Sequence, residues 1–202
     1  MTAQNEQQPA ENYSPAASVC HVEQGVLLIV DIQDRLTSIM PDKVVSRVRR
    51  HTGMLLRAAG LLDVPVIATE QYPKGLGRLE EDLAKLIPAG STVYEKTCFS
   101  CTDVEDFLQR LSAMGRHQVI IAGIEAHICV LQTALDLRQA GYEVFVVGDA
   151  VCSRNRENYE NALHRLRHAQ VVISDAESVV FEWLRDSKHP HFKALSAMIQ
   201  GK

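Results

Sequence analysis

Short apolar runs recur along the chain and alternate with longer segments in which apolar residues return every three or four positions. The run at 25–30 reads Gly-Val-Leu-Leu-Ile-Val and is followed by the acidic Asp31. An apolar run that does not alternate with polar residues is typical of a strand covered on both faces, as in a parallel sheet. The pattern predicts five further strands, at 66–69, 91–95, 118–122, 142–147 and 171–173.

The segments between these runs carry the helical pattern. The longest, 42–62, begins at Asp42, which can cap a helix. Thr102 and Glu105 have the spacing of a capping box, ahead of a helix that ends near Met114. Further helices are predicted at 79–87, 131–140, 155–166, 176–184 and 193–199.

Strands and helices therefore alternate six times along the chain. This alternation predicts a three-layer α/β/α fold, with a six-stranded parallel, doubly wound sheet and helices on both faces. We expect one domain over 21–202, because no internal repeat and no change of composition interrupts it. Residues 1–20 are rich in Gln, Asn, Ala, Pro and Ser, with little to bury, and predict a disordered tail. This tail lacks the pattern of a secretory signal or a mitochondrial presequence.

Composition and charge narrow the classes of partner. The net charge is −4, and the basic residues form no patch that would indicate nucleic-acid binding. No apolar run approaches the length of a membrane span. The five cysteines are an odd number without a regular framework, which favours reduced thiols in the cytoplasm. We therefore expect a small-molecule substrate and neither a nucleic acid nor a membrane as partner.

The stretch at 123–130, Gly-Ile-Glu-Ala-His-Ile-Cys-Val, joins a predicted strand to a predicted helix. Cys129 should lie in the first turn of that helix, just beyond the carboxyl end of the strand. A thiol at a helix N-terminus ionises more easily, and the thiolate is the reactive form. Because Ile128 and Val130 flank it, Cys129 could instead be a buried small hydrophobic residue.

Two other residues with useful chemistry follow strands. Asp31 ends the first predicted strand and Lys96 follows the third, so both should share one edge of the sheet with Cys129. Taken singly, Asp31 could cap a turn and Lys96 could be a solvated loop residue. Taken together, an acid, a cation and a nucleophile at one edge favour a catalytic site.

Five motifs lie beside the predicted strand ends, at 30–34, 69–77, 95–100, 123–130 and 149–154. Together they resemble the isochorismatase-like superfamily of cysteine hydrolases, which also contains nicotinamidases and N-carbamoylsarcosine amidohydrolases. The resemblance covers 25 to about 180 and is closest to small isochorismatase-domain proteins. It implies the isochorismatase-like hydrolase fold, a catalytic triad of Asp31, Lys96 and Cys129, a cis peptide between Ile124 and Glu125, and a homo-oligomer.

The implied triad suggests a mechanism for hydrolysing a small amide or a related C–N bond. Lys96 and the helix N-terminus would favour the thiolate of Cys129, and Asp31 would take the thiol proton and hand it to the leaving nitrogen. Cys129 would attack the carbonyl and form a thioester. The backbone N–H groups of Glu125 and Cys129 would form the oxyanion hole, and the cis peptide would aim the first of them.

Departures from the superfamily pattern bear on the chemistry. Nicotinamidases carry a metal-binding Asp-x-His after the second strand, where this chain has Gln71 and Pro73. We therefore expect no metal and no cofactor, and the difference argues against nicotinamide as the substrate. Isochorismatases cleave a vinyl ether without a nucleophile, so the presence of Cys129 argues against isochorismate. An ether hydrolase of that type remains the first alternative.

Residues near the predicted edge are candidates for binding the substrate. Gln71 and Tyr72 could contact it, Phe99 could form a wall, and His127 could line the pocket, although a lone His more often packs or caps. Cys98 and Cys101 have the spacing of a redox dithiol. A non-enzymatic or redox-responsive binding protein on the same fold is therefore the second alternative.

Overall fold

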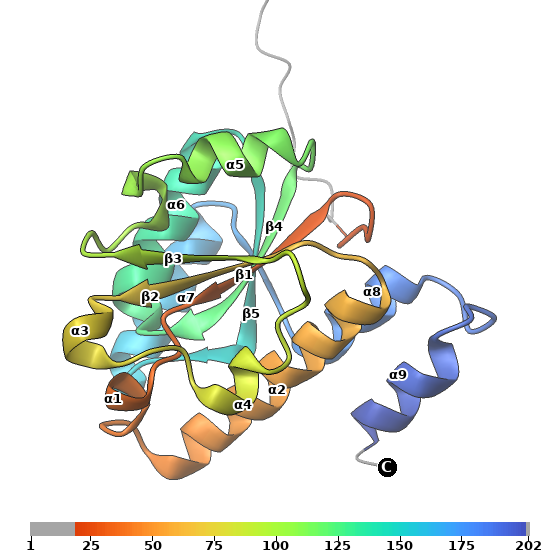
Figure 1. Ribbon diagram of the computed structural model, residues 1–202, viewed down its shortest axis with the longest axis horizontal. Helices are drawn as coiled ribbons and strands as arrows, with labels where there is room; N and C mark the ends of the chain where they lie inside the picture. Colours follow the sequence, from red (N-terminus) through yellow and green to blue (C-terminus); the bar gives the residue numbers. More distant parts are fainter. Residues whose placement is uncertain (1–18, 201–202) are drawn as a thin grey trace, which may run out of the picture.

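The computed structural model describes residues 19–200, which form a six-stranded parallel sheet with helices on both faces (Figure 1). The strands lie in the order β3-β2-β1-β4-β5-β6. The predicted fold class, a doubly wound α/β/α arrangement, is confirmed. The strands are β1 (Gly25–Val30), β2 (Val66–Gln71), β3 (Thr92–Lys96), β4 (Gln118–Ile124), β5 (Glu143–Cys152) and β6 (Val172–Ser174).

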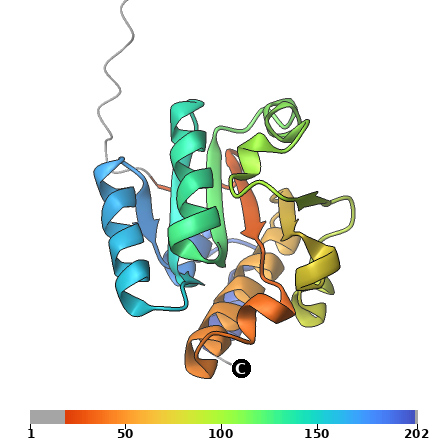
Figure 2. The same cartoon turned by 90° about the vertical axis from the view of Figure 1, so that its left-hand side faces the viewer.

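Two groups of helices cover the sheet (Figures 1 and 2). One face carries α2 (Asp42–Leu61), α8 (Ala176–Leu184) and α9 (Phe192–Ile199). The other carries α5 (Phe107–Ala113), α6 (Leu131–Gln139) and α7 (Arg156–His168). The connections contain α1 (Asp34–Thr37), α3 (Pro73–Leu76), α4 (Glu81–Ala84), a 3₁₀ turn η1 (Cys101–Asp103) and a π-helical turn η2 (Ala126–Val130).

Two apolar cores, one on each face, explain the continuous apolar run of β1. Leu27 and Ile29 pack in the core beneath α2, whereas Leu28 and Val30 pack in the core beneath α6. Successive side chains of a strand point to opposite faces, so a strand between two helical layers needs apolar residues at every position. Each fully buried side chain of this size contributes roughly 1.5–3 kcal/mol to folding.

The chain reverses its direction of travel across the sheet between β1 and β4, which are neighbours. The long helix after β1 covers one face, and the helix after β4 covers the other. Connections that leave two adjacent strands towards opposite faces open a crevice at the carboxyl ends of those strands, where doubly wound proteins bind ligands. Asp31 and Cys129 lie just beyond β1 and β4 respectively, at this edge.

Helix starts differ from the sequence-based expectations in two places. Asp42 is the first residue of α2 rather than its cap, since Pro41 holds the cap position. Thr102 and Glu105 form no capping box, because the helix begins later, at Phe107, behind Asp106 in the left-handed conformation. The Thr102 N–H instead donates to the Ser100 hydroxyl oxygen and opens η1.

Other elements differ in length. The predicted helix at 79–87 is reduced to α4 (Glu81–Ala84), and β5 runs to Cys152 rather than ending at 147. A register shift between Ile121 and Gly123 in the β4–β5 pairing lets β5 continue towards the site. A bulge of this kind re-aims a strand end and is common beside functional sites.

The predicted tail, 1–20, lies mostly outside the described residues. Of its last two residues, Cys20 is buried and its N–H donates to Glu182 Oε2 at 2.8 Å, so the ordered fold begins before the expected boundary. Among the described residues, no helix combines the length and the apolar character that crossing a membrane requires.

Candidate active site

Asp31, Lys96 and Cys129 come from three connections at the carboxyl edge of the sheet. Asp31 follows β1 with φ 54°, Lys96 is the last residue of β3, and Cys129 lies in η2 after β4. All three are buried, with 1%, 4% and 6% of their surface exposed. The predicted convergence of acid, cation and thiol therefore occurs inside the protein, where charges interact more strongly than in water.

Asp31 and Lys96 form a fully buried ion pair. Lys96 Nζ donates to Asp31 Oδ2 at 2.7 Å, and the Thr69 hydroxyl donates to the other oxygen, Oδ1, at 2.7 Å. The side chains of Asp31 and Lys96 are 1% and 0% exposed. A buried carboxylate is tolerated when it is paired and hydrogen-bonded, and Asp31 satisfies both conditions.

The ammonium group of Lys96 is surrounded by oxygen acceptors. Besides Asp31, it donates to Gln71 Oε1 at 2.6 Å and approaches the carbonyl oxygens of Cys98 at 3.3 Å and Phe99 at 3.2 Å. Burial is the largest single influence and lowers the pKa of Lys96, but the charge of Asp31 and the smaller raising contributions together outweigh it, so the pKa lies above its ordinary value. An ammonium has three protons, and these acceptors occupy all of them.

Cys129 is placed as expected but is not predisposed to ionise. It lies in the first turn of the helical segment after β4, yet that turn is a π-helix. Burial, followed by the negative charge of Asp31, raises the pKa of Cys129 well above the ordinary value, while Lys96 lowers it less strongly. The expectation that Lys96 and the helix N-terminus lower the pKa of this thiol is therefore not met, because burial and Asp31 together raise it more than Lys96 lowers it.

The expected cis peptide between Ile124 and Glu125 is also wrong. Every peptide bond of residues 19–200 is trans, and Glu125 instead takes the left-handed conformation, with φ 54° and ψ 59°. The same sharp turn out of β4 is thus made by a positive φ. The Glu125 side chain in this sparsely populated conformation pairs through Oε1 with Arg154 Nε at 2.6 Å, and its Oε2 lies 3.3 Å from His127 Nδ1.

The four candidate substrate contacts occupy different surroundings. Gln71 is partly buried at the rim of the Asp31–Lys96 pair, with Oε1 accepting from Lys96 and Nε2 donating to the Thr97 carbonyl at 2.8 Å. Tyr72 and Phe99 are each 54% exposed. Tyr72 lines a cavity of about 360 Å³ beside the end of β3. These two aromatic side chains are thus available to a ligand, whereas Gln71 is engaged with Lys96.

His127 faces away from this cluster, towards the loop after β5. Its Nδ1 lies 3.0 Å from Ser153 Oγ and 3.3 Å from Glu125 Oε2, and its Nε2 lies 3.4 Å from Asn158 Nδ2. Both ring nitrogens therefore have protein partners. The arrangement fits a residue that supports the Glu125 turn.

Sequence reasoning missed two polar residues that organise the site. Thr69 binds Asp31, and Gln33 clamps Gln71: the Gln71 N–H donates to Gln33 Oε1 at 2.7 Å, and Gln33 Nε2 donates to the Gln71 carbonyl at 3.0 Å. Both lie inside the motifs at 30–34 and 69–77. Their partners depend on the register between β1 and β2, which pairs Val30 with Thr69.

The two cysteines of the possible dithiol differ in burial. Cys101 is fully buried, and its thiol lies 3.9 Å from Thr69 Oγ1; burial is the main cause that raises its pKa to about 11. Cys98 is partly exposed, and its carbonyl faces Lys96. All five cysteines are free thiols in the structure. Cys101 belongs to the buried wall of the site.

The position of the nicotinamidase metal ligands does not fit a metal here. Pro73 has no side-chain donor atom, and the Gln71 oxygen is taken by Lys96. Among residues 19–200, no group of three or more His, Cys, Asp or Glu side chains is arranged to hold a metal ion.

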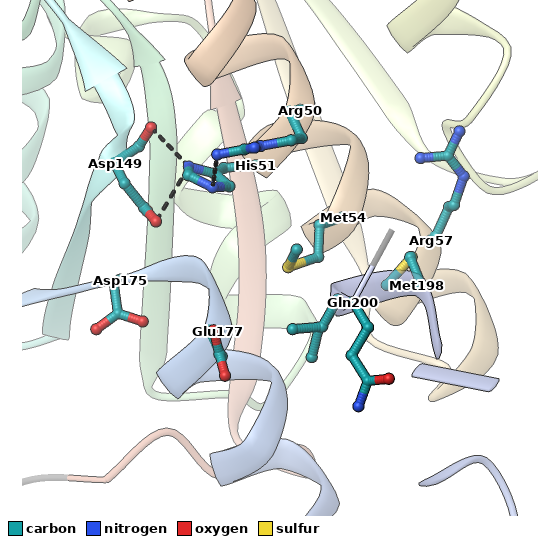
Figure 3. Close-up of a pocket in the computed structure, with 10 residues that line it drawn as sticks. Arg50, His51, Met54, Arg57, Asp149, Asp175, Glu177, Met198 and Gln200 are labelled. Carbon is teal, nitrogen blue, oxygen red and sulfur yellow. Dashed lines mark hydrogen bonds and ion pairs between the residues drawn. The ribbon is translucent and has the colours of Figure 1, made fainter. Parts of the chain in front are cut away.

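A separate cavity of about 420 Å³ lies on the face of the sheet that α2, α8 and α9 cover, and residues of these three helices line it (Figure 3). His51 Nδ1 lies 3.0 Å from Asp149 Oδ2, and Arg50 Nη2 lies 3.1 Å from His51 Nε2. Asp149 Oδ1 also accepts the N–H of Ala176, at the start of α8. This cavity contains none of the three predicted catalytic residues.

Comparisons with known proteins agree with the fold and the motifs. The isochorismatase domain model matches residues 25–178. Isochorismatase domain-containing protein 2 of Danio rerio is 40% identical over 178 residues, which cover 87% of this chain and 86% of that protein.

Two solved structures extend the likeness. The MAR1 ribonuclease of Caenorhabditis elegans superposes with a TM-score of 0.85 at 31% identity, covering 91% of this chain and 93% of that one. The YcaC gene product of Escherichia coli, described as an octameric hydrolase of unknown specificity, has a TM-score of 0.79 at 25% identity, covering 91% and 97%. The chain therefore belongs to the isochorismatase family.

Proposed function

We propose that this protein is a metal-independent cysteine hydrolase that cleaves a small amide or a related C–N bond. The observation that carries the proposal is the buried Asp31–Lys96 pair beside the thiol of Cys129. A nucleophile, a group that can take its proton, and a fixed positive charge are thereby held together at the carboxyl edge of the sheet. This combination is the minimum required for covalent catalysis at a carbonyl.

The reaction begins from a neutral thiol. As Cys129 Sγ bonds to the substrate carbonyl carbon, its proton passes to Asp31, and negative charge develops on the carbonyl oxygen. We assign the oxyanion hole to the backbone N–H groups of Glu125 and Cys129; a donor of this kind is typically worth about 3–4 kcal/mol. The left-handed turn at Glu125 is the backbone feature that supports this role.

The second half of the cycle returns the proton. Asp31 gives its proton to the leaving nitrogen as the C–N bond breaks, which leaves a thioester on Cys129. Water then attacks the thioester: Asp31 takes a proton from the water, the C–O bond forms and the C–S bond breaks. The released thiolate of Cys129 recovers that proton from Asp31, and the acid product leaves.

Lys96 acts on Asp31 and Cys129 in this scheme rather than on the substrate. Its three protons are taken by Asp31, Gln71 and the backbone carbonyls of the loop at 98–99. A fixed positive charge attracts the Asp31 carboxylate and stabilises negative charge on sulfur. Lys96 therefore holds the acid–base group in place throughout the cycle.

The surroundings of Cys129 favour a small substrate. Cys129 is 6% exposed, while Tyr72 and Phe99 are half-exposed at the same edge. We assign these two aromatic side chains to substrate contact. Gly75 supports Tyr72 closely, because a Cβ at Gly75 would lie 2.2 Å from Tyr72 Cε1.

Ammonia release from a panel of small primary amides and carbamoyl compounds tests the proposal. At least one compound should be hydrolysed by the wild type, and Cys129→Ala should lose that activity by 1,000-fold or more. Cys20→Ala removes a buried thiol at the other end of the molecule, beside Glu182, and should retain it. Full activity in Cys129→Ala would contradict the covalent mechanism.

An ether hydrolase of the isochorismatase type is distinguished by the same variants. Protonation of a vinyl ether needs an acid but no nucleophile, so activity would survive Cys129→Ala and be lost in Asp31→Ala. Isochorismate is the probe.

Phosphodiester cleavage is a further candidate, because a structure that is 31% identical carries the name ribonuclease. The saturated donor set of Lys96 leaves no free ammonium proton for a phosphate. We therefore expect no cleavage of a single-stranded RNA. Cleavage that is lost in Asp31→Asn would favour the ribonuclease function instead.

We also propose a homo-oligomer, by analogy with the octameric YcaC. Light scattering on the purified protein measures its mass in solution, and a monomer at micromolar concentration would contradict this.

A further inference from the structure

Thr69 contacts Asp31 in two ways from the neighbouring strand. Its hydroxyl donates to Asp31 Oδ1 at 2.7 Å, and its carbonyl oxygen accepts the Asp31 N–H at 3.2 Å. Thr69 is fully buried and pairs with Val30, the residue before Asp31. The backbone and the side chain of Asp31 are therefore both fixed by one residue.

The direction of the side-chain bond follows from the chemistry of the two groups. An ionised carboxylate can only accept hydrogen bonds, so the Thr69 hydroxyl is the donor. Its remaining acceptor capacity faces the weakly donating thiol of Cys101, 3.9 Å from Thr69 Oγ1. The hydroxyl proton is thus committed to Asp31 while that carboxylate is charged.

The two oxygens of Asp31 are held by side chains from two neighbouring strands, β2 and β3. Lys96, at the end of β3, binds Oδ2, and Thr69, in β2, binds Oδ1. Turning the carboxylate about its Cβ–Cγ bond would break both contacts at once. Lys96 is itself anchored by Gln71, so loss of Thr69 would free one oxygen only.

From these contacts we propose that Thr69 is a positioning residue, which holds the Asp31 carboxylate in the orientation that receives the Cys129 proton. A donor that contacts only the charged form of an acid makes protonation of that acid harder. Removing the Thr69 hydroxyl should therefore raise the pH below which Asp31 no longer works as a base. This inference rests on the proposed role of Asp31 as the base for Cys129.

Alkylation of Cys129 by iodoacetamide measures this effect without knowledge of the substrate. At a pH below the pKa of the thiol, the reactive thiolate forms when the Cys129 proton passes to Asp31. This transfer takes up and releases no proton from solvent, so the alkylation rate should be independent of pH until the pH is low enough to protonate Asp31 itself. At still lower pH the alkylation rate falls. This low-pH part of the rate profile, called the acid limb below, reports on the protonation of Asp31. Peptide mass spectrometry separates Cys129 from the other four cysteines.

Thr69→Val keeps the branched shape and removes the hydroxyl. We expect its acid limb to move to higher pH by about one unit, the effect of losing one hydrogen bond to a charged group. Thr52→Val is the matched control: Thr52 is equally buried, lies in α2, and its hydroxyl has no partner among residues 19–200. Its limb should coincide with that of the wild type.

Thr69→Ser and Thr69→Ala keep the test valid if the valine variant is poorly folded. Both lose the methyl group and differ only in the hydroxyl, so serine should retain the wild-type limb and alanine should shift it. Thermal unfolding of each variant confirms that the folded protein is being alkylated.

Three other results would overturn either the role of Thr69 or the proposed function, and they can be told apart. If Asp31→Asn loses the limb while Thr69→Val and Thr69→Ala leave it unmoved, the inference about Thr69 is overturned and the proposed function stands. If Asp31→Asn keeps the wild-type limb, Asp31 is not the base and Thr69 has nothing to position. If Cys129 is not alkylated at any pH, the site does not admit a molecule of small-amide size, and the proposed function fails with it.

Discussion

Two acid–base pairs of similar length stand in contrasting surroundings. Lys96 Nζ lies 2.7 Å from Asp31 Oδ2, and His51 Nδ1 lies 3.0 Å from Asp149 Oδ2. The side chains of the first pair are 0% and 1% exposed, whereas those of the second are 15% and 26% exposed, beside the cavity of Figure 3. The N–O distances alone do not tell the two pairs apart.

The residues around the two pairs differ in kind. Asp31 also binds the Thr69 hydroxyl and lies beside the Cys129 thiol, so every charge of this pair acts within the protein. Asp149 binds a backbone N–H at the start of α8, and His51 faces Arg50 at the cavity. A buried ion pair next to a nucleophile is therefore the candidate for catalysis, whereas an open pair mainly joins structural elements.

The largest difference between the two pairs should appear in turnover, when the aspartate of each pair is replaced by asparagine. Asp31→Asn removes the group that we propose takes the thiol proton, and it should lower the rate of ammonia release by 1,000-fold or more. Asp149→Asn, on the opposite face, should leave the rate within a few-fold of the wild type. Equal losses in both variants would remove the distinction between the two pairs.

Breaking the pairs should also separate them in stability. Lys96→Met leaves Asp31 buried without its counter-charge and should lower the free energy of unfolding by about 3–5 kcal/mol. His51→Ala breaks a partly exposed pair and should cost about 1 kcal/mol or less. Urea unfolding at neutral pH measures both. A loss in His51→Ala as large as that in Lys96→Met would show that burial is not the deciding factor.

The buried cluster should make the protein sensitive to alkaline pH. Burial raises the pKa of Cys101 from 9.0 to about 11. A raised pKa contributes stability that is fully present below the ordinary value and is lost as the pH rises through the folded value. Stability should therefore fall above pH 9, and Cys101→Ala should reduce this fall by roughly 2 kcal/mol.

His51→Ala serves as the comparison for that alkaline profile, because the open pair contains no thiol or lysine. Its unfolding free energy should decline with pH as steeply as that of the wild type. If Cys101→Ala and His51→Ala have the same alkaline slope as the wild type, the buried thiol contributes nothing there.

The smallest expected effect concerns the two buried threonines. Thr69 donates to a carboxylate, whereas the Thr52 hydroxyl has no partner among residues 19–200. Thr52→Val removes a buried, unpaired hydroxyl and should stabilise the protein by up to about 1 kcal/mol, while Thr69→Val should destabilise it. Thermal unfolding midpoints give the signs, and a stabilised Thr69→Val would contradict the assigned hydrogen bond.

The apolar runs predicted the fold because a strand buried on both faces imposes a pattern that few other structures share. The convergence of Asp31, Lys96 and Cys129 followed from topology, since parallel strands bring their carboxyl ends to one edge. Thr69 could not be identified in the same way, because its partner depends on the register of β1 with β2.

Two local expectations failed for physical reasons that lie outside the local sequence. The protonation of Cys129 depends on how deeply packing buries it and on the distance to Asp31, neither of which a motif contains. The turn at Glu125 is made by a left-handed residue held by Arg154 and His127, side chains that only the folded chain brings together.

In the proposed mechanism, Cys129 rests as a neutral thiol and passes its proton to Asp31 during the reaction. The ultraviolet absorbance of thiolate, taken as the difference between the wild type and Cys129→Ala during a pH titration, measures the resting state of the thiol. We expect no thiolate signal from Cys129 at neutral pH, and its appearance only in alkaline solution. A full thiolate signal at neutral pH would contradict this mechanism and would make Asp31 unnecessary as the base for the thiol.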